Sequence, residues 1–267
     1  MCALPLAKTE SVMPYQAQLD LQRYLSRLTS RSLLQREEQQ AILDLPTHAA
    51  QVQSNQDFVC LGDSPDHACL IAAGLVGRFG QNAEGGRQIT AFHIPGDMAN
   101  LHSVVQPRAG SALQALTTTT ILRIPHEALR RVAARYPAVA EAFWRDCMVD
   151  AAILSQWVVN VGRRNARTRM AHLICETATR SRKDGELQAL TFGFAITQAH
   201  LADSTGMTAV HVNRTLKSLV DVVKLSGTVA LILDWERLAA IGEFDPDYLQ
   251  IATEPDRIRI AQGFSVG

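Results

Sequence analysis

The segment from Ile196 to Leu219, ITQAHLADSTGMTAVHVNRTLKSL, constrains this chain more than any other. Thr197 and Thr208 stand where helix N-caps are needed. Gly206 lies between them and can adopt the left-handed conformation of a tight turn. Apolar residues recur at the spacing of one buried helical face. The segment therefore predicts two short helices joined by a turn. A helical hairpin inside an ordinary all-α core is the alternative.

The second of these helices is expected to project polar side chains away from its apolar face. They are His211, Asn213, Arg214 and Lys217. These residue types contact base edges and phosphates in protein–DNA complexes. The helix pair is therefore a candidate DNA-reading element.

Charge is balanced over the whole chain, with 26 Lys and Arg against 26 Asp and Glu, so any nucleic-acid surface must be local. Residues 163–183, just upstream of the helix pair, hold seven Lys or Arg and one Glu. We expect them to form a phosphate-facing patch rather than a merely solvated run. No apolar run approaches the ~20 residues of a membrane span, and the first residues lack the pattern of a signal peptide. These features predict a cytoplasmic protein with no membrane partner.

The chain of 267 residues is long enough for about two domains. Residues 16–45 have a helical pattern. Short apolar runs separated by Gly and Pro follow from His48 to Ile124, which predicts a barrel or roll rather than a parallel sheet. The expected strands are Cys69–Ala73, Leu75–Phe79, Gln88–Phe92, Ala112–Leu116 and Thr119–Ile124.

A long helix is predicted after Pro137, and its apolar residues alternate at intervals of four and three, as in a coiled coil. The predicted seam begins at Ala140, and its dimer-interface residues are Trp144, Cys147, Ala151, Leu154, Val158 and Val161. A helix lying on its own roll is the alternative. Further on, residues 223–233 predict two short strands around a Ser-Gly turn, as in a wing.

This order of elements resembles the CRP/FNR family of bacterial transcription regulators. The resemblance rests on Gly85-Gly86-Arg87-Gln88 and Pro95-Gly96-Asp97 in the roll, on the long helix, and on the helix pair at 196–219. It implies an α+β fold: an N-terminal double-stranded β-roll (jelly-roll-like), a long dimerisation helix and a C-terminal winged helix-turn-helix. The expected divisions are 16–136, 137–162, 163–240 and a C-terminal tail at 241–267.

The resemblance also implies a homodimer that places two recognition helices in successive major grooves of a palindromic DNA site. RNA polymerase is a further partner if the protein is an activator. Carried over from the family, the base-reading positions are Ala209, Val210, Asn213 and Arg214. The predicted DNA-contacting residues are Thr197, Gln198, Thr208, Ala209, Val210, His211, Asn213, Arg214 and Lys217.

The roll departs from cyclic-nucleotide-binding members of the family. Asn100-Leu101 stands where a ribose-binding Gly-Glu pair is expected, and Gly110-Ser111-Ala112 stands where Arg-Ser-Ala would supply the phosphate-binding arginine. A buried phosphate without that arginine loses a strong bidentate contact. Arg108 could replace it only after a loop shift. We therefore expect no binding of cyclic AMP in the familiar manner.

Other cofactors have little support in the sequence, and none is predicted. The oxygen-sensing branch of the family needs several N-terminal cysteines for an iron–sulfur cluster, and only Cys2 lies near the N-terminus here. Cys60, Cys69, Cys147 and Cys175 are scattered and favour free thiols over a metal site. Haem with His93 or His102 as axial ligand is a weak alternative, because a lone histidine in a roll is more often structural.

The function predicted from all this is sequence-specific transcription regulation. An enzyme is not indicated, since there is no P-loop, GxSxG, HExxH or credible paired-carboxylate motif. The alternative is a signalling protein that senses haem or a small molecule other than cyclic AMP, with a C-terminal domain that contacts proteins.

Overall fold

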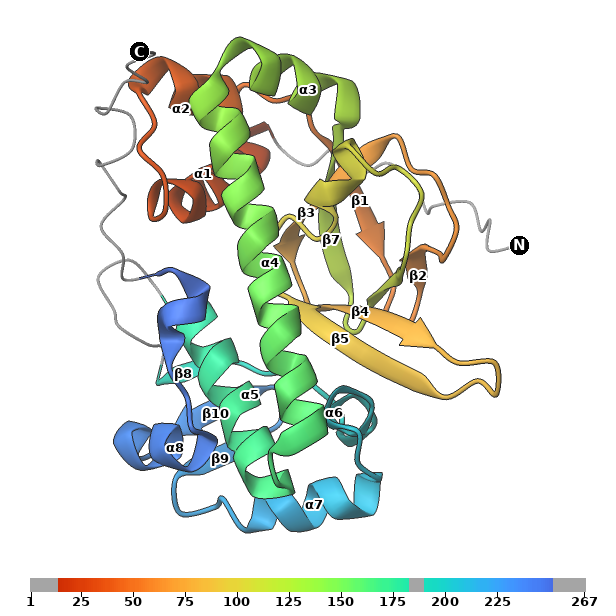
Figure 1. Ribbon diagram of the computed structural model, residues 1–267, viewed down its shortest axis with the longest axis vertical. Coiled ribbons are helices and arrows are strands. Elements are labelled where there is room, and N and C mark those ends of the chain that lie inside the picture. Colours follow the sequence, from red (N-terminus) through yellow and green to blue (C-terminus); the bar gives the residue numbers. More distant parts are fainter. Residues whose placement is uncertain (1–13, 183–189, 252–267) are drawn as a thin grey trace, which may run out of the picture.

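The computed structural model describes residues 14–182 and 190–251. A β-rich N-terminal part lies on one side of a long helix, α4 (Pro137–Arg163), and a compact helical part surrounds the lower end of that helix (Figure 1). The architecture is the α+β fold predicted from the sequence. No helix of the described ranges is long and apolar enough to span a bilayer.

The roll consists of two antiparallel sheets, with strand orders β1-β7-β3 and β2-β6-β4-β5. A small apolar core that includes Ile71, Val76 and Leu113 fills the space between them. All five predicted strands are found, and two more precede them. The strands are β1 (His48–Val52), β2 (Asp57–Val59), β3 (His67–Ala73), β4 (Val76–Gln81), β5 (Arg87–His93), β6 (Ala112–Ala115) and β7 (Thr119–Pro125).

Helices cover the outer face of the first sheet. Leu21, Tyr24 and Leu28 form the buried face of α1, which begins two residues before the predicted helical region; residues 1–13 lie outside the described part. These side chains pack against Leu70 and Leu122 of the roll. The helices of this part are α1 (Pro14–Thr29), α2 (Arg36–Leu43), the short 3-10 helix η1 (Leu101–Val104) and α3 (His126–Arg135).

The C-terminal part begins with α5, whose first turn is capped by the side chain of Asn165. Its elements are α5 (Ala166–Arg180), β8 (Thr191–Gly193), α6 (Gln198–Thr205), α7 (Ala209–Lys217), β9 (Val223–Ser226), β10 (Val229–Ile232), α8 (Trp235–Gly242) and the 3-10 helix η2 (Pro246–Leu249). The expected tail from residue 241 is wrong at its start, because Leu249 is fully buried and Tyr248 donates a hydrogen bond to Glu176 at 2.9 Å. Residues 252–267 lie outside the described part.

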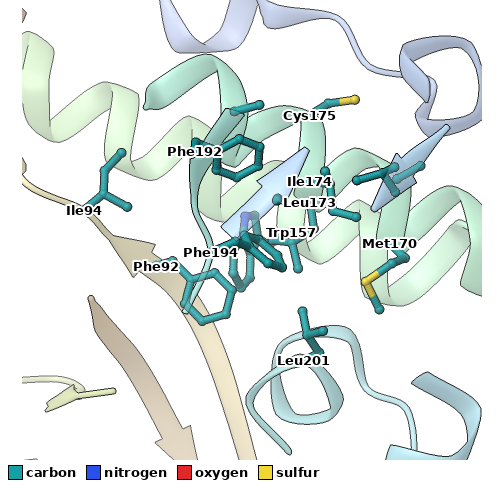
Figure 2. Close-up of a cluster of buried hydrophobic side chains, with 14 of the residues drawn as sticks. Phe92, Ile94, Trp157, Met170, Leu173, Ile174, Cys175, Phe192, Phe194 and Leu201 are labelled. Atoms are coloured by element: carbon teal, nitrogen blue, oxygen red, sulfur yellow. The ribbon is translucent and has the colours of Figure 1, made fainter. Parts of the chain in front are cut away.

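One continuous apolar core joins the roll to the C-terminal part (Figure 2). Phe92 of β5 contacts Trp157 of α4 edge to face, with ring centroids 5.3 Å apart. Leu201 of α6 and Leu173 of α5 belong to the same cluster. Burial of such large side chains contributes about 1.5–3 kcal/mol each. The C-terminal part is therefore packed firmly against the roll and does not hang from a free linker.

Candidate nucleic-acid interface

The predicted helix pair is present as α6 and α7. The hydroxyl of Thr197 accepts a hydrogen bond from the backbone N–H of His200 at 3.1 Å, and the hydroxyl of Thr208 accepts one from His211 at 3.2 Å. Both threonines are thus the N-caps that the sequence predicted. Gly206 ends α6 with φ +63°, a conformation that side chains disfavour.

Internal contacts hold the turn between the two helices against α4 and α5. The guanidinium of Arg169 donates to the carbonyl oxygens of Thr205, Val161 and Arg164. A Cβ added at Gly206 would lie 3.3 Å from a methyl group of Val161. The turn therefore has little room to move, and α7 is presented on a rigid base.

Helix α7 turns Val212 and Thr215 inward and exposes the opposite face. Val210 on that face is 82% exposed. None of the nine predicted DNA-contacting residues is buried. The exposed ones are Thr197, Gln198, Thr208, Ala209, Val210, Arg214 and Lys217, and the half-buried ones are His211 and Asn213. Their contacts with DNA stay a prediction.

The basic segment at 163–183 does not form one phosphate-facing patch, so that expectation is wrong in part. Arg180 forms ion pairs with Asp97 and Glu176 at 2.7 and 3.0 Å inside the protein. Arg164 and Arg169 also bind acceptors within the chain. Glu176 lies four residues before Arg180 on the same helix, but the run of charges gave no signal of Asp97, because that partner comes from the roll.

Two other cations of the segment, Arg163 and Arg167, are exposed around the junction of α4 and α5. Lys183 lies outside the described residues. Phosphate contact therefore stays a prediction for these two arginines.

A small antiparallel sheet stands next to the helix pair, with strand order β8-β10-β9. The predicted hairpin is present, and its turn contains Gly227 with φ +58°. The sequence reading missed β8, which is only three residues long. The sheet completes a winged helix-turn-helix.

The α4 face that carries the predicted seam is open in the single chain. Trp144 is 68% exposed, Val158 65% and Leu154 38%. Ala151 and Val161 are exposed as well, and Cys147 is half-buried. The opposite face of α4, which includes Val149, Ile153 and Trp157, packs inside the chain. The helix thus lies on its own roll with one face and leaves the seam free.

The roll also touches the helix pair directly. Arg87 of β5 lies 3.5 Å from the carboxylate of Asp203, and the side-chain amide of Gln88 donates to the carbonyl of Ser204 at 3.2 Å. The sequence marked the motif at residues 85–88 but gave no hint of this contact. The β4–β5 hairpin therefore couples the roll to α6.

Two protein-family models match the chain in the order of its parts. A cyclic nucleotide-binding domain matches residues 50–136, and a Crp-like helix-turn-helix domain matches residues 168–241. The anaerobic regulatory protein of Haemophilus influenzae is 25% identical over 185 residues, which cover 68% of this chain and 72% of that protein. The chain belongs to the CRP/FNR family.

Other relatives agree with this assignment. The fumarate and nitrate reduction regulatory protein of Vibrio cholerae is 23% identical over 189 residues, covering 70% of this chain and 75% of that protein. The solved structure of FixK2 from Bradyrhizobium japonicum has the same fold, with a TM-score of 0.66 and 22% identity over 74% of this chain and 98% of that chain. The protein is a DNA-binding transcription regulator of the CRP/FNR type.

Beside its apolar core, the regulator's roll holds polar side chains that are engaged by other groups of the chain. The Arg78 guanidinium donates to the carbonyl of Ala99 at 2.6 Å and pairs with Asp150 of α4 at 2.7 Å. The side-chain oxygen of Asn100 accepts from the backbone N–H of Cys69 at 2.7 Å. The cavity beside these groups measures about 10 Å³, room for about one water molecule.

Leu101 and Gly110, the two positions that depart from the cyclic-nucleotide pattern, do not line this cavity, although their chain neighbours do. Leu101 is buried at the start of η1, and Gly110 lies in an exposed loop where an added Cβ would meet no atom within 4 Å. Arg108, the cation considered as a substitute, is exposed. In this conformation the loop offers no buried arginine that could pair with a phosphate inside the roll.

The histidines considered as haem ligands lie around another small cavity, of about 40 Å³. Burial, helped by Arg78, lowers the pKa of His93 to about 3, and its Nε2 has no hydrogen-bond partner among the described residues. His102 is half-buried, and its pKa is also lowered by burial. The cavity has room for a few water molecules and none for a porphyrin, so these residues do not fit a haem site in this conformation.

The cysteines occupy separate environments. Burial raises the pKa of the Cys69 and Cys147 thiols to about 12 and raises that of Cys175 further. Within residues 14–182 and 190–251, no group of three or more His, Cys, Asp or Glu side chains could hold a metal ion. Cys2 lies outside these ranges. The donor set around each described cysteine does not suit an iron–sulfur cluster.

Proposed function

We propose that this regulator binds a palindromic DNA site as a homodimer, with one α7 helix in the major groove of each half-site. The observation that carries the proposal is the open face of α7, presented on a rigid base next to a wing. A helix in this setting is the usual reader of the major groove. If the regulator activates transcription, RNA polymerase is a further partner.

The side chains of α7 suggest what the helix reads. Arg214 can donate two hydrogen bonds to guanine, and Asn213 can pair with adenine. Ala209 and Val210 offer no hydrogen bond but can contact a thymine methyl group. We expect Lys217 and the capping threonines, Thr197 and Thr208, to contact phosphates. We therefore expect each half-site to contain a thymine that Ala209 or Val210 contacts and a guanine that Arg214 contacts. Positions that α7 does not contact should vary in sequence.

The seam on α4 supports a two-fold dimer. Trp144, Leu154 and Val158 lie along one face of the helix, and all three are exposed in the single chain. Apolar residues spaced by four and three associate with an equivalent helix. A symmetric pair would hold two α7 helices about one DNA turn apart, near 34 Å.

Selection from random DNA with the purified protein tests this function. The expected result is an inverted repeat whose half-site centres are about 10 base pairs apart. Enrichment of no sequence, or of a single unrepeated motif, would refute the proposed mode of binding.

We further propose that cyclic AMP is not the effector. The support is the filled roll, in which Arg78 is engaged by Asp150, together with Leu101 and Gly110 at the nucleotide-contacting positions. Losing two polar contacts at about 2–3 kcal/mol each would weaken a micromolar site to roughly millimolar. Calorimetry with cyclic AMP should detect no tight binding; a dissociation constant near or below about 10 μM that also raises DNA affinity would overturn this proposal.

A further inference from the structure

A third cavity, far larger than the two small ones described above, lies between α1, the roll and the C-terminal part. It is a cleft of about 1210 Å³, lined by α1, by the roll around Ile94 and Pro95, and by the end of α5 together with β8. Figure 1 shows α1 beside the upper part of α4, on the side away from the strands, and the C-terminal part around the lower end of α4. The cleft is therefore bordered by both domains of the regulator.

The charged residues that line this cleft are all arginines among the described residues. Arg23 and Arg27 lie four residues apart on α1 and Arg31 follows its end, whereas Arg180 is the last residue of α5 and Arg182 lies just beyond it. No Asp or Glu of residues 14–182 or 190–251 lines it. Such a distribution produces a positive potential inside a partly enclosed space, which attracts anions.

The carboxylates that balance some of these arginines lie behind the cleft wall. Asp97 pairs with Arg27 at 2.5 Å and with Arg180 at 2.7 Å, and Asp146 pairs with Arg31 at 2.9 Å. Even so, the Nε atom of Arg31 is buried and has no hydrogen-bond partner among the described residues. The wall therefore retains unused donor capacity.

Arg23 is the most accessible of these cations. Its side chain is 50% exposed, and its contacts with Asp20 and with the carbonyl of Ala72 are both long, at 3.4 Å. Its partner Asp20 is only 2% exposed, so the carboxylate end of this pair is buried. The length of both contacts leaves the guanidinium able to turn toward an incoming anion.

The remaining lining suits the organic part of a ligand. Ser26 and Ser181 add hydroxyl groups near the arginines, and Leu75, Ile94 and Phe192 add apolar surface. The volume exceeds the ~300–1,000 Å³ of most ligand pockets, so a molecule of nucleotide size fits. Planar guanidinium groups bind phosphate with paired hydrogen bonds, which favours phosphate over other anions.

We propose that this cleft binds a small organic molecule with two or more phosphate groups. The phosphates lie among the five arginines, and the organic part contacts the apolar wall. Because the arginines belong to α1 and the turn after it on one side and to the DNA-binding part on the other, the bound molecule bridges the two. The consequence for DNA binding rests on the function proposed above, whereas the site itself does not.

Calorimetry on the full chain, without DNA, tests the site. The probes are inorganic pyrophosphate and ATP, with adenosine as the uncharged control. Both phosphates should bind and adenosine should not. ATP should bind more tightly than pyrophosphate, because its base and ribose add contacts. Absence of heat with both phosphates up to about 1 mM would overturn the proposal.

Charge-reversal variants locate the binding. R23E should weaken ATP binding by at least about tenfold, and the milder Q22E, at an exposed lining residue, should weaken it less. R36E changes an exposed arginine on α2 outside the cleft, and R108E changes the exposed loop of the roll. Both controls should leave binding unchanged. Thermal unfolding should match the wild type in Q22E, R36E and R108E, and R23E should still unfold cooperatively although it removes the cation beside Asp20.

Two results would refute the assignment. Loss of ATP binding in R108E with retention in R23E would place the ligand in the roll. An unchanged ATP affinity in R23E together with weaker DNA binding would instead make the cleft a contact for the DNA backbone.

Bound ligand should also alter DNA binding, because it connects both sides of the cleft. At saturating ATP, the dissociation constant for the selected DNA should change by at least about threefold, and DNA should change ATP affinity by the same factor. A tight ATP site without this coupling would refute the effector role. DNA binding without ligand is measured separately, so failure of the cleft and failure of the DNA-binding function are distinguishable.

Discussion

Arginines act differently in two regions of this regulator. On the exposed face of α7, Arg214 has no partner among the described residues and is free to contact a base. At the junction between α1, the roll and α5, Arg27 and Arg180 converge on one carboxylate, Asp97, and fix three elements relative to one another. The position of the nearest carboxylate, and not the residue type, decides whether an arginine reads a ligand or stabilises the fold.

This contrast predicts that the two regions respond to mutation in separate ways. Changes on α7 should alter DNA affinity and leave stability intact. Changes at the junction should lower the free energy of unfolding and have little effect on DNA sequence preference. The seam on α4 forms a third case, because it should control assembly.

The largest effect is expected at the seam. L154D should give monomers, because each chain would bring an unpaired carboxylate into the interface, at a cost of about 3–5 kcal/mol for each charge. Binding to a palindrome should then be lost. Sedimentation velocity measures the assembly state, and anisotropy measures DNA binding.

L61D is the matched control, because Leu61 is an exposed leucine of the roll, 68% accessible and away from α4. It should remain dimeric and bind DNA normally. A dimeric L154D protein would show that the subunits associate elsewhere.

The next largest effect is expected at the junction. R180M leaves Asp97 and Glu176 buried with one cation fewer, which should cost about 3–5 kcal/mol of unfolding free energy. R237M removes an exposed ion pair with Asp221 and should cost less than about 1 kcal/mol. Urea denaturation compares the two variants. Equal losses of unfolding free energy in R180M and R237M would mean that the buried ion pairs of Arg180 stabilise the fold no more than an exposed pair does.

On α7, R214A should weaken DNA binding by about 1–3 kcal/mol and relax preference at one base pair per half-site. K217A should weaken all sequences alike and lower the salt slope by about one. Both variants should have the same urea unfolding midpoint as the wild type. Unchanged sequence preference in R214A would mean that the recognition face is misplaced.

The smallest effect concerns acid stability. Burial lowers the pKa of His172 from 6.5 to about 4, with a smaller contribution from Arg164. In the unfolded chain, His172 is protonated below about pH 6.5, whereas in the folded chain it stays neutral down to about pH 4. The free energy of unfolding therefore falls as the pH is lowered from 6.5 to 4.

The variant H172F removes the titrating group but keeps a ring. Between pH 7.5 and pH 5.5, the wild type should lose about 1 kcal/mol more stability than this variant. Urea midpoints at the two pH values measure the difference. Parallel pH dependence in the two proteins would argue against a neutral, buried His172.

Local rules were enough to predict much of the fold. Threonine caps, a turn glycine and helical periodicity located α6 and α7, and alternating runs located most strands. Short elements such as β2 and β8 carry too few residues for a pattern. The tail was predicted to start too early because burial of Leu249 depends on a core contributed by distant helices.

The site was less predictable, because long-range contacts decide it. Nothing near Arg78 in the sequence shows that Asp150, 72 residues later, faces it and closes the roll. The cationic run at 163–183 likewise gave no sign that Arg180 turns inward. Contacts between side chains far apart in sequence lie beyond what spacing and composition can show.

The central claim is that two copies of α7 read one symmetric site. The most direct test is sedimentation of the wild-type protein with its selected DNA, intact or with one half-site scrambled. We expect a complex of two protomers per intact site, and an affinity loss of at least about a hundredfold when either half-site is scrambled. One protomer per site, with unchanged affinity after scrambling, would contradict it.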